Sequence, residues 1–283
     1  MKKLILLMSA CALALSGIFV YDQAKFSDGR LHLVICNVGQ GDAIFIRTPR
    51  GQDILIDSGR DSRVLDCLEN NMPFWDRELE LVFATHPDAD HIGGFESVLR
   101  SYKVLSFNTS KKTTDTQVFA RLQRTIQEQN IPLRYIYAGD RYSLGNDTII
   151  STLWPTKQYV ELDSGSFPSN TFSLVQVLSY GDFRTLLTGD IESQVLDSLF
   201  PSPYKIDVLK VPHHGSKTGM SRTLLDVIKP ELAVISVGKN SYGHPTAFIL
   251  NLLSQVNIKT LRTDKSGEVE IISDGKSWFV KEN

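Results

Sequence analysis

The stretch T-H-P-D-A-D-H-I-G-G at 85–94 limits the possible folds of this chain more than any other, because it has four potential metal ligands within six residues. An apolar run at 81–84 leads into it, which is typical of a strand that ends at the cluster. Clustered carboxylates repel one another, and neighbouring imidazoles lack partners, unless a cation is present. We therefore expect one or two divalent metal ions here. The ligand candidates are His86, Asp88, Asp90 and His91.

The length and net charge of the chain limit its possible domain number and functions. A chain of 283 residues fits one large domain or two small ones. The net charge of -2 argues against a strongly basic nucleic-acid-binding surface overall, although it allows a local basic patch. The three cysteines, Cys11, Cys36 and Cys67, form an odd number without C-x-x-C spacing, so we predict no disulfide framework. Cys36 lies in an apolar run and is expected to be a small buried hydrophobe.

The N-terminus, residues 1–26, predicts export. Lys2 and Lys3 precede an uncharged apolar run at 4–21, close to the ~17–25 residues that span a bilayer. Three readings stay open, namely a cleaved signal peptide, an uncleaved membrane anchor, and a lipoprotein signal ending at Cys11. In each, the lysines remain inside and the body is extracytoplasmic, either secreted or held at the membrane through residues 4–21.

Residues 29–283 are expected to form one domain of two sheets flanked by helices, because strands and helices alternate without a repeat or a linker. The segment at 155–169 is expected to be a surface loop near the site. Strands are predicted at 31–36, 42–48, 52–57, 79–84, 103–107, 133–137, 148–153, 171–179, 182–188, 206–211, 232–237, 258–262, 268–273 and 278–280. Helices are predicted at 61–70, 94–102, 114–129, 191–200, 221–230 and 246–255.

Three further motifs follow predicted strands: T-G-D at 188–190, H-H-G-S at 213–216 and G-H-P at 243–245. Five of the six histidines lie in these motifs and the first cluster, and only His32 lies elsewhere. Scattered structural histidines would not sort in this way. Considered alone, Asp190 would be interpreted as a helix N-cap, but the presence of the other motifs favours a metal ligand.

Six motifs in this order resemble the metallo-β-lactamase superfamily, and within it the extracytoplasmic hydrolase domain of ComEC-type competence proteins. They are N-V-G-Q-G-D-A at 37–43, L-I-D-S-G at 55–59, H-P-D-A-D-H-I-G-G at 86–94, N-T-F-S-L-V at 170–175, L-L-T-G-D-I-E at 186–192 and L-K-V-P-H-H-G-S-K-T at 209–218. The usual H-x-H-x-D-H is here H-x-D-x-D-H, which is normal for this subgroup. The multi-helix channel of competence proteins is absent, so we expect the hydrolase domain to stand alone.

The resemblance implies an α/β (α+β) fold, a four-layer αββα sandwich with a two-metal site at one edge. Zinc is the expected metal, and manganese is possible because the ligand set has carboxylates and no thiolate. One metal would be held by His86, Asp88 and His214, and the second by Asp90, His91 and His244, with Asp190 bridging them.

The remaining candidates surround these ligands. The expected catalytic residues are Asp90 and His213, with His213 as hydrogen-bond donor or acid toward the substrate. The roles of His213 and His214 could be reversed. Asp57 is expected to orient a ligand histidine. Possible substrate contacts are Gln40, Asp42, Asn170, Ser216, Lys217 and Asn240, of which Lys217 could equally be a solvated surface charge.

The predicted function is hydrolysis of an anionic ester outside the cytoplasm, with a phosphodiester such as single-stranded DNA as first choice. One alternative is an esterase for phosphorylcholine-decorated envelope polymers. Another is a non-catalytic, metal-stabilised component of an uptake machinery that binds DNA or a partner. No obligate protein partner is evident from the sequence.

Overall fold

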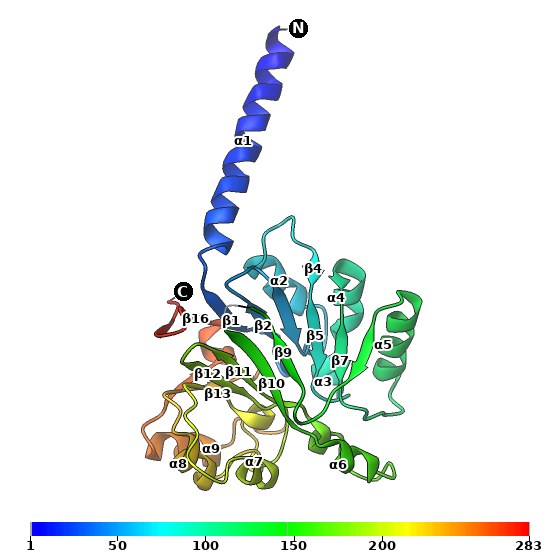
Figure 1. The fold of residues 1–283 in the computed structure, drawn as a ribbon, viewed down its shortest axis with the longest axis vertical. Helices are drawn as coiled ribbons and strands as arrows, with labels where there is room; N and C mark the ends of the chain where they lie inside the picture. The colour runs from blue at the N-terminus through cyan, green and yellow to red at the C-terminus, as the bar shows by residue number, and fades with distance from the viewer. Residues whose placement is uncertain (1, 146, 283) are drawn as a thin grey trace.

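The computed structural model describes residues 2–145 and 147–282 and has two sheets packed face to face, with helices on their outer sides (Figure 1). The eight-stranded sheet has the order β17-β16-β1-β2-β3-β5-β7-β8, and the seven-stranded sheet β15-β14-β13-β12-β11-β10-β9. The first contains β1 (Leu31–Ile35), β2 (Ile44–Arg47), β3 (Asp53–Ile56), β5 (Leu81–Ala84), β7 (Phe107–Thr109), β8 (Leu133–Tyr135), β16 (Val269–Ser273) and β17 (Trp278–Val280). The second contains β9 (Arg141–Ser143), β10 (Thr148–Trp154), β11 (Val175–Tyr180), β12 (Phe183–Leu187), β13 (Val208–Lys210), β14 (Leu232–Ile235) and β15 (Lys259–Arg262).

Short helices complete the body, together with a small pair of strands, β4 (Glu78–Leu79) and β6 (Lys103–Val104). The helices are α2 (Val64–Asn71), α3 (Ala89–Ile92), α4 (Phe95–Ser101), α5 (Gln117–Glu128), α6 (Lys157–Glu161), α7 (Ser193–Leu199), α8 (Arg222–Ile228), α9 (Ala247–Gln255) and α10 (Thr263–Ser266). Two 3-10 turns, η1 (Ser169–Phe172) and η2 (Pro212–Gly215), lie beside the site.

Three apolar layers hold the four structural layers together. Alternate residues of a strand point to opposite faces, so Leu33 of β1 enters the layer between the sheets while Val34 enters the layer under α2, α4 and α5. On the other side, Val234 of β14 faces the first sheet and Ala233 faces α7, α8 and α9. Both faces of each sheet are therefore buried, and the predicted αββα sandwich is confirmed.

The predicted element boundaries are mostly right, with four main differences. The strand predicted at 79–84 is divided into β4 and β5, and the strand predicted at 103–107 ends at Val104 before β7 begins at Phe107. The segment at 155–169 contains a short helix, α6, and the short strand β9 was not predicted. These pieces have two to five residues, too few to show a hydrophobic period.

The parallel strands place the sequence motifs at one edge. β3, β5 and β7 run parallel in the first sheet, and β12, β13 and β14 run parallel in the second. The carboxyl ends of parallel strands lie on the same side of a sheet. The sandwich therefore brings the residues after β3, β5, β12, β13 and β14 together at one edge.

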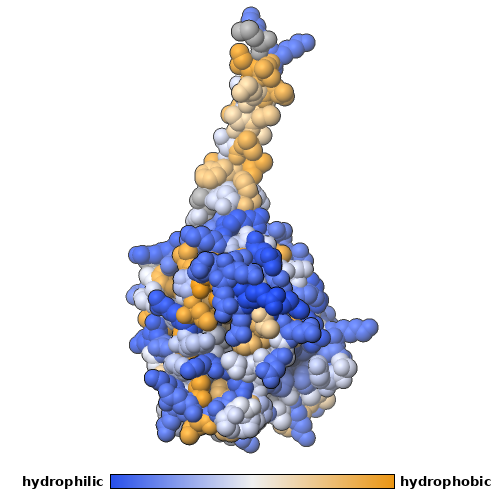
Figure 2. Space-filling view, turned by 90° about the vertical axis from the view of Figure 1, so that its right-hand side faces the viewer, coloured by the Kyte–Doolittle hydropathy of each residue, from blue (hydrophilic) through white to orange (hydrophobic). Residues whose placement is uncertain are grey.

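Helix α1 (Lys2–Phe26) projects away from the body (Figure 1). Its segment Lys2–Tyr21 is long and apolar enough to cross a membrane, and none of it is buried against the rest of the chain. Figure 2 shows this apolar segment standing above a largely hydrophilic body. A membrane anchor and a signal sequence both have this character.

The expectation that the chain has no disulfide is wrong, because Cys36 and Cys67 are joined with their Cα atoms 5.8 Å apart. Cys36 follows β1 directly, and Cys67 lies on α2, which packs on the outer face of the same sheet. Both sulfurs lie in the apolar layer beneath α2. The odd count of cysteines concealed the pair, since Cys11 is exposed and free.

Removal of this disulfide is expected to destabilise the body. The bond closes a loop with a sequence separation of 31 residues, and closure of such a loop stabilises by about 3–4 kcal/mol through the unfolded state. The double variant Cys36→Ala/Cys67→Ala should lose that free energy of unfolding in urea titrations. Cys11→Ala is the matched control and should unfold like the parent protein. Equal midpoints for the double variant and the control would contradict the prediction.

Candidate metal centre

The first cluster is built where β5 ends. The strand delivers Thr85 and His86 to the edge of the sheet, and extended backbone at Asp88 then starts the one-turn helix α3. Asp90 and His91 lie on that turn. The chain therefore changes direction within six residues, and these two side chains face the same space as His86. Gly41 lies so close beneath that a Cβ atom on it would meet the Asp90 carbonyl oxygen at 2.1 Å.

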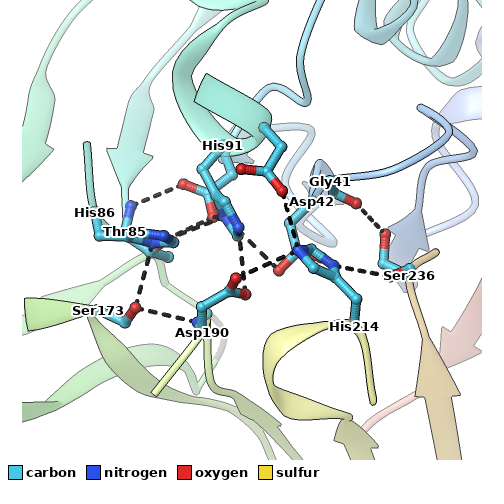
Figure 3. Close-up of polar contacts among 12 residues, drawn as sticks. Gly41, Asp42, Thr85, His86, His91, Ser173, Asp190, His214 and Ser236 are labelled. Atoms are coloured by element: carbon cyan, nitrogen blue, oxygen red, sulfur yellow. Dashed lines mark hydrogen bonds and ion pairs between the residues drawn. The ribbon is translucent and has the colours of Figure 1, made fainter. Parts of the chain in front are cut away.

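Three buried histidines share one arrangement (Figure 3). In each, the Nδ1 atom contacts a neighbouring group and the Nε2 atom faces the centre without a hydrogen-bond partner in the described part of the chain. The Nδ1 contacts are His86 to Thr85 Oγ1 (3.0 Å) and Ser173 Oγ (3.2 Å), His91 to Asp57 Oδ2 (2.7 Å) and His214 to the Ser236 carbonyl (3.0 Å).

These partners assign the proton of each imidazole. A carbonyl and a carboxylate only accept, so the Nδ1 atoms of His214 and His91 donate. The Thr85 hydroxyl donates to Asp57 at 2.7 Å, so its oxygen is free to accept from Nδ1 of His86. In the neutral rings, all three Nε2 atoms then present lone pairs to the centre, as the ligand histidines of metal sites do.

Asp190 lies between these imidazoles. Its Oδ1 is 3.2 Å from His91 Nε2 and its Oδ2 is 3.3 Å from His214 Nε2, while Oδ1 has no hydrogen-bond partner among the described residues. The Asp190 backbone N–H donates to Ser173 Oγ at 3.1 Å, which fixes the turn after β12. The carboxylate is therefore held where two cations could share it.

Asp88 and Asp90 close opposite ends of the centre. Asp88 Oδ2 is 3.6 Å from His86 Nε2, and its Oδ1 accepts a 2.5 Å hydrogen bond from Ser169. Asp90 Oδ2 is 3.4 Å from His214 Nε2. Ser169 ends the segment at 155–169, so the prediction that this segment lies near the site is confirmed.

The distances group the candidate ligands differently in two places from the grouping that the family resemblance implies, which stays a prediction. His214 was expected with His86 and Asp88, but its ligand atom lies within 4.8 Å of those of Asp90 and His91. His244 was expected with Asp90 and His91, yet it forms no ion pair in the described part of the chain, and its ring lies 5.5 Å from that of His213. The packing of the second sheet on the first sets these distances, which no motif spacing encodes.

The adjacent histidines differ clearly. His214 is buried, whereas 25% of the His213 side chain is exposed, and its Nε2 is 3.7 Å from Asp190 Oδ2. Both adopt positive φ values, 48° and 53°, which turns the two rings in different directions. Burial lowers the pKa of His213, so this ring is neutral at neutral pH.

Asp42 and Lys210 form an ion pair beneath the metal centre. The Lys210 side chain is only 1% exposed, and its Nζ also donates to the Gly189 carbonyl at 3.2 Å. Asp42 Oδ1 lies 3.4 Å from His214 Nδ1. Sequence reasoning selected Asp42 and missed Lys210, although a lysine inside an apolar strand was a signal that could have found it.

The electrostatics of the cluster favour a cation. Burial alone would lower the pKa of His91 and His214, but carboxylates, Asp190 foremost, raise both well above the usual value. Burial alone would raise the pKa of Asp190, and the two imidazoles hold it well below its usual value. Burial opposes ionisation of Asp42 too, yet Lys210 helps to lower its pKa to about 2. A divalent cation supplies the positive charge that these carboxylates attract and displaces imidazole protons.

The remaining predicted residues divide into two groups. Asp57 accepts hydrogen bonds from Thr85 and His91, in line with the orienting role predicted for it. Asn170 Nδ2 lies 3.5 Å from His213 Nε2 and so reaches the substrate side of the centre. The hydroxyl of Ser216 lies by Thr218 instead, and Lys217 is exposed without an ion pair within the described residues. Gln40 and Asn240 lie beside the centre, in the loops that carry Asp42 and His244.

Several hydroxyl and carbonyl groups that fix the ligands were not predicted. They come from Thr85, Ser169, Ser173 and Ser236. Small polar residues are frequent in turns, so their types alone give no usable signal.

The Asp42–Lys210 pair yields a stability prediction. Lys210→Met leaves the Asp42 carboxylate buried without its partner, which costs about 3–5 kcal/mol of unfolding free energy. Lys103→Met, which removes an exposed pair with Glu78, is the control and should cost less than about 1 kcal/mol. Urea unfolding followed by circular dichroism compares the two. A Lys210→Met variant as stable as the control would show that the pair does not hold the site together.

Comparisons with known proteins identify the family of this chain. The model of the metallo-beta-lactamase superfamily matches residues 36–239. ComE operon protein 3 of Bacillus subtilis is 30% identical over 92% of this chain and 35% of its own length. Recombination protein 2 of Haemophilus influenzae is 29% identical over 83% and 28%, and competence protein ComA of Neisseria gonorrhoeae is 25% identical over 91% and 34%. The chain thus spans about a third of the length of these relatives, and the predicted resemblance to ComEC-type competence proteins is confirmed.

Solved structures show the same fold at low sequence identity. Igni18, a metallo hydrolase from Ignicoccus hospitalis, has a TM-score of 0.56 at 15% identity, covering 84% of this chain and 98% of its own. Zn(2+)-bound PqqB from Methylobacterium extorquens has a TM-score of 0.54 at 13% identity, covering 82% and 98%. Metal-dependent hydrolases share this sandwich, and the fold implies binding of divalent metal. By its matching model, its fold and its ordered motifs, the chain belongs to the metallo-beta-lactamase superfamily.

Proposed function

We propose that this protein is a metal-dependent phosphodiesterase with two divalent ions at the edge of the sandwich. One observation carries the proposal. Three buried Nε2 atoms without hydrogen-bond partners among the described residues face the space beside one buried, unpartnered oxygen of Asp190. Buried polar atoms are rarely left unsatisfied unless a ligand is meant to meet them. Imidazoles and carboxylates without a thiolate suit zinc, and manganese is the alternative.

The distances support a revised ligand assignment. His86 and Asp88 form one end of the centre and Asp90 and His214 the other, as their close contacts indicate. His91 and Asp190 lie between the two ends, where His91 Nε2 would join one shell and the two oxygens of Asp190 could serve both. When bound, such a pair of ions lowers the pKa of water and neutralises charge that develops on a phosphoryl group.

The protein's own residues hold this centre in shape. Asp57 fixes the ring of His91, and Thr85 and Ser173 fix that of His86. Asp42, paired with Lys210, places a negative charge behind His214. Orientation by such outer contacts is a large part of the activity of metal sites.

His213 is proposed to meet the substrate. Its neutral, partly exposed ring lies beside Asn170, at the open side of the centre. A neutral imidazole can donate a hydrogen bond to the leaving oxygen, and water then supplies the proton of the leaving group. Burial of His214 supports its role as the ligand of the two histidines.

The substrate is proposed to be a nucleic-acid phosphodiester, single-stranded DNA first. Relatives named for competence and recombination support this choice. The body, residues 29–283, is proposed to work outside the cytoplasm, either anchored through α1 or released after cleavage of residues 1–26. The Cys36–Cys67 disulfide supports this location, because such bonds persist in oxidising compartments.

Metal removal is the direct test of the proposal. The full chain should hydrolyse bis(p-nitrophenyl) phosphate and single-stranded DNA, EDTA should abolish both activities, and added zinc or manganese should restore them. Asp90→Ala and His91→Ala should be inactive and bind less metal by elemental analysis. Turnover unchanged in both variants would refute the assignment. Tight metal without turnover on any ester would indicate the non-catalytic adaptor, and turnover of phosphocholine esters alone the envelope esterase.

Asp57→Asn tests the orienting contact. An amide keeps the size of the side chain but cannot accept from Thr85 and His91 with a full charge, so His91 loses its preferred orientation. We expect activity or metal affinity to fall about 10–100-fold. Asp226→Asn, an exposed change on α8, is the matched control and should keep full activity. Retention of both metal affinity and rate in Asp57→Asn would exclude the orienting role.

A further inference from the structure

A hollow of about 380 Å³ lies beside the candidate metal centre, outside the ligand cluster. Its walls come from three segments far apart in the sequence, namely the loop after β1, the residues before α2, and the loop after β14. The residues that matter for its chemistry are Gln40, Arg60, Arg63, Lys239, Asn240 and Tyr242. None of the described residues that line it is acidic.

The hollow adjoins the rim of the metal centre through Asn240 and Tyr242. Asn240 Nδ2 donates to the carbonyls of Gly238 and His244, at 2.8 Å each, and the Tyr242 ring stacks beside that of His244 at 5.8 Å. The His244 ring in turn lies 5.5 Å from His213, the residue proposed to meet the substrate. A linear molecule leaving the metal centre on this side would therefore enter the hollow.

The positive charge of the hollow is local. The whole chain has a net charge of -2, yet three cations line this one space. Arg60 and Lys239 are exposed and form no ion pair within residues 2–145 and 147–282. Such a concentration of one sign attracts an anionic partner more than scattered surface cations do.

The Arg63 side chain is held in place by Asp61 and Gly39. Its Nε and Nη2 atoms donate to the Asp61 carboxylate at 2.9 Å each, and the side chain remains 49% exposed. The guanidinium packs on the backbone of Gly39, where an added Cβ atom would lie 2.3 Å from Nη1. Glycine at that position, with φ of 73°, leaves room for the guanidinium to face the hollow.

Tyr242 provides an apolar surface at the edge of the hollow. Its side chain is 66% exposed, although its ring already stacks on one face against His244. An exposed aromatic ring among cations is the combination by which proteins bind single strands, with bases stacked on rings and phosphates on cations. An inorganic anion or a polymer without bases would use the cations and leave the ring unused.

We infer that this hollow binds the backbone of a single-stranded nucleic acid on one side of the bond to be cleaved. Arg60, Arg63 and Lys239 contact successive phosphates, and Tyr242 stacks on a base. The inference rests on the proposed phosphodiesterase function, which it extends by naming the surface that holds the polymer.

Binding of labelled oligothymidylate to the full chain in detergent, measured by fluorescence anisotropy in EDTA over a series of salt concentrations, tests the inference without requiring hydrolysis. For Arg60→Gln/Lys239→Gln, the slope of log K against log salt should become less steep by about 1.4, the value for two lost phosphate contacts on a single strand. The control Arg124→Gln/Lys276→Gln removes two exposed cations elsewhere and should keep the parent slope. Tyr242→Ala should weaken binding about 5-fold or more at every salt concentration.

Three results would overturn the inference. The first is that the parent protein shows no measurable binding. The second is that the salt slope is equal in the hollow and control variants. The third is that poly(glycerol phosphate) binds as tightly as oligothymidylate and that Tyr242→Ala has no effect. The outcome is separate from that of the proposed function. A changed slope in a protein that hydrolyses no phosphodiester would support the hollow and refute the phosphodiesterase.

Discussion

The metal centre is organised around the Asp190 carboxylate, which is buried between the imidazoles of His91 and His214. A buried carboxylate is expensive unless positive charge and hydrogen bonds surround it. Here the imidazoles lie 3.2 and 3.3 Å away, and each is fixed from behind by an acceptor. The surrounding residues therefore fix the geometry of the centre. A cation would balance the negative charge of its carboxylates.

The arrangement of a carboxylate between two imidazoles explains why the site needs both sheets. The first sheet supplies His86 and His91 after β5, whereas the second supplies Asp190 after β12 and His214 after β13. Neither sheet alone has both the central carboxylate and the imidazoles that flank it. The apolar layer between the sheets thus does two tasks, because it stabilises the fold and fixes the distance between the two halves of the centre.

Much of this could be predicted from the sequence, because some signals are local. The four ligands at 86–91 lie in one short stretch, and the ordered motifs carry the superfamily and its sandwich. The contacts that cross between layers could not be predicted. The neighbours of His214, the burial of Lys210 against Asp42, and the pairing of Cys36 with Cys67 all follow from packing between segments far apart in the chain. The metal to which His244 belongs stays a prediction of the family resemblance, since its ring lies beside that of His213 and no spacing of motifs encodes that distance.

The Cys36–Cys67 bond has a consequence that reaches beyond stability. Cys36 immediately precedes the loop that carries Gln40 and Asp42, and Cys67 lies one turn into the helix that Arg63 precedes. The bond therefore ties together two of the walls of the hollow beside the metal centre. A surface that is preorganised in this way loses less conformational entropy when a flexible polymer binds. Formation of the bond therefore restricts the movement of the loop after Cys36 relative to the residues that precede α2.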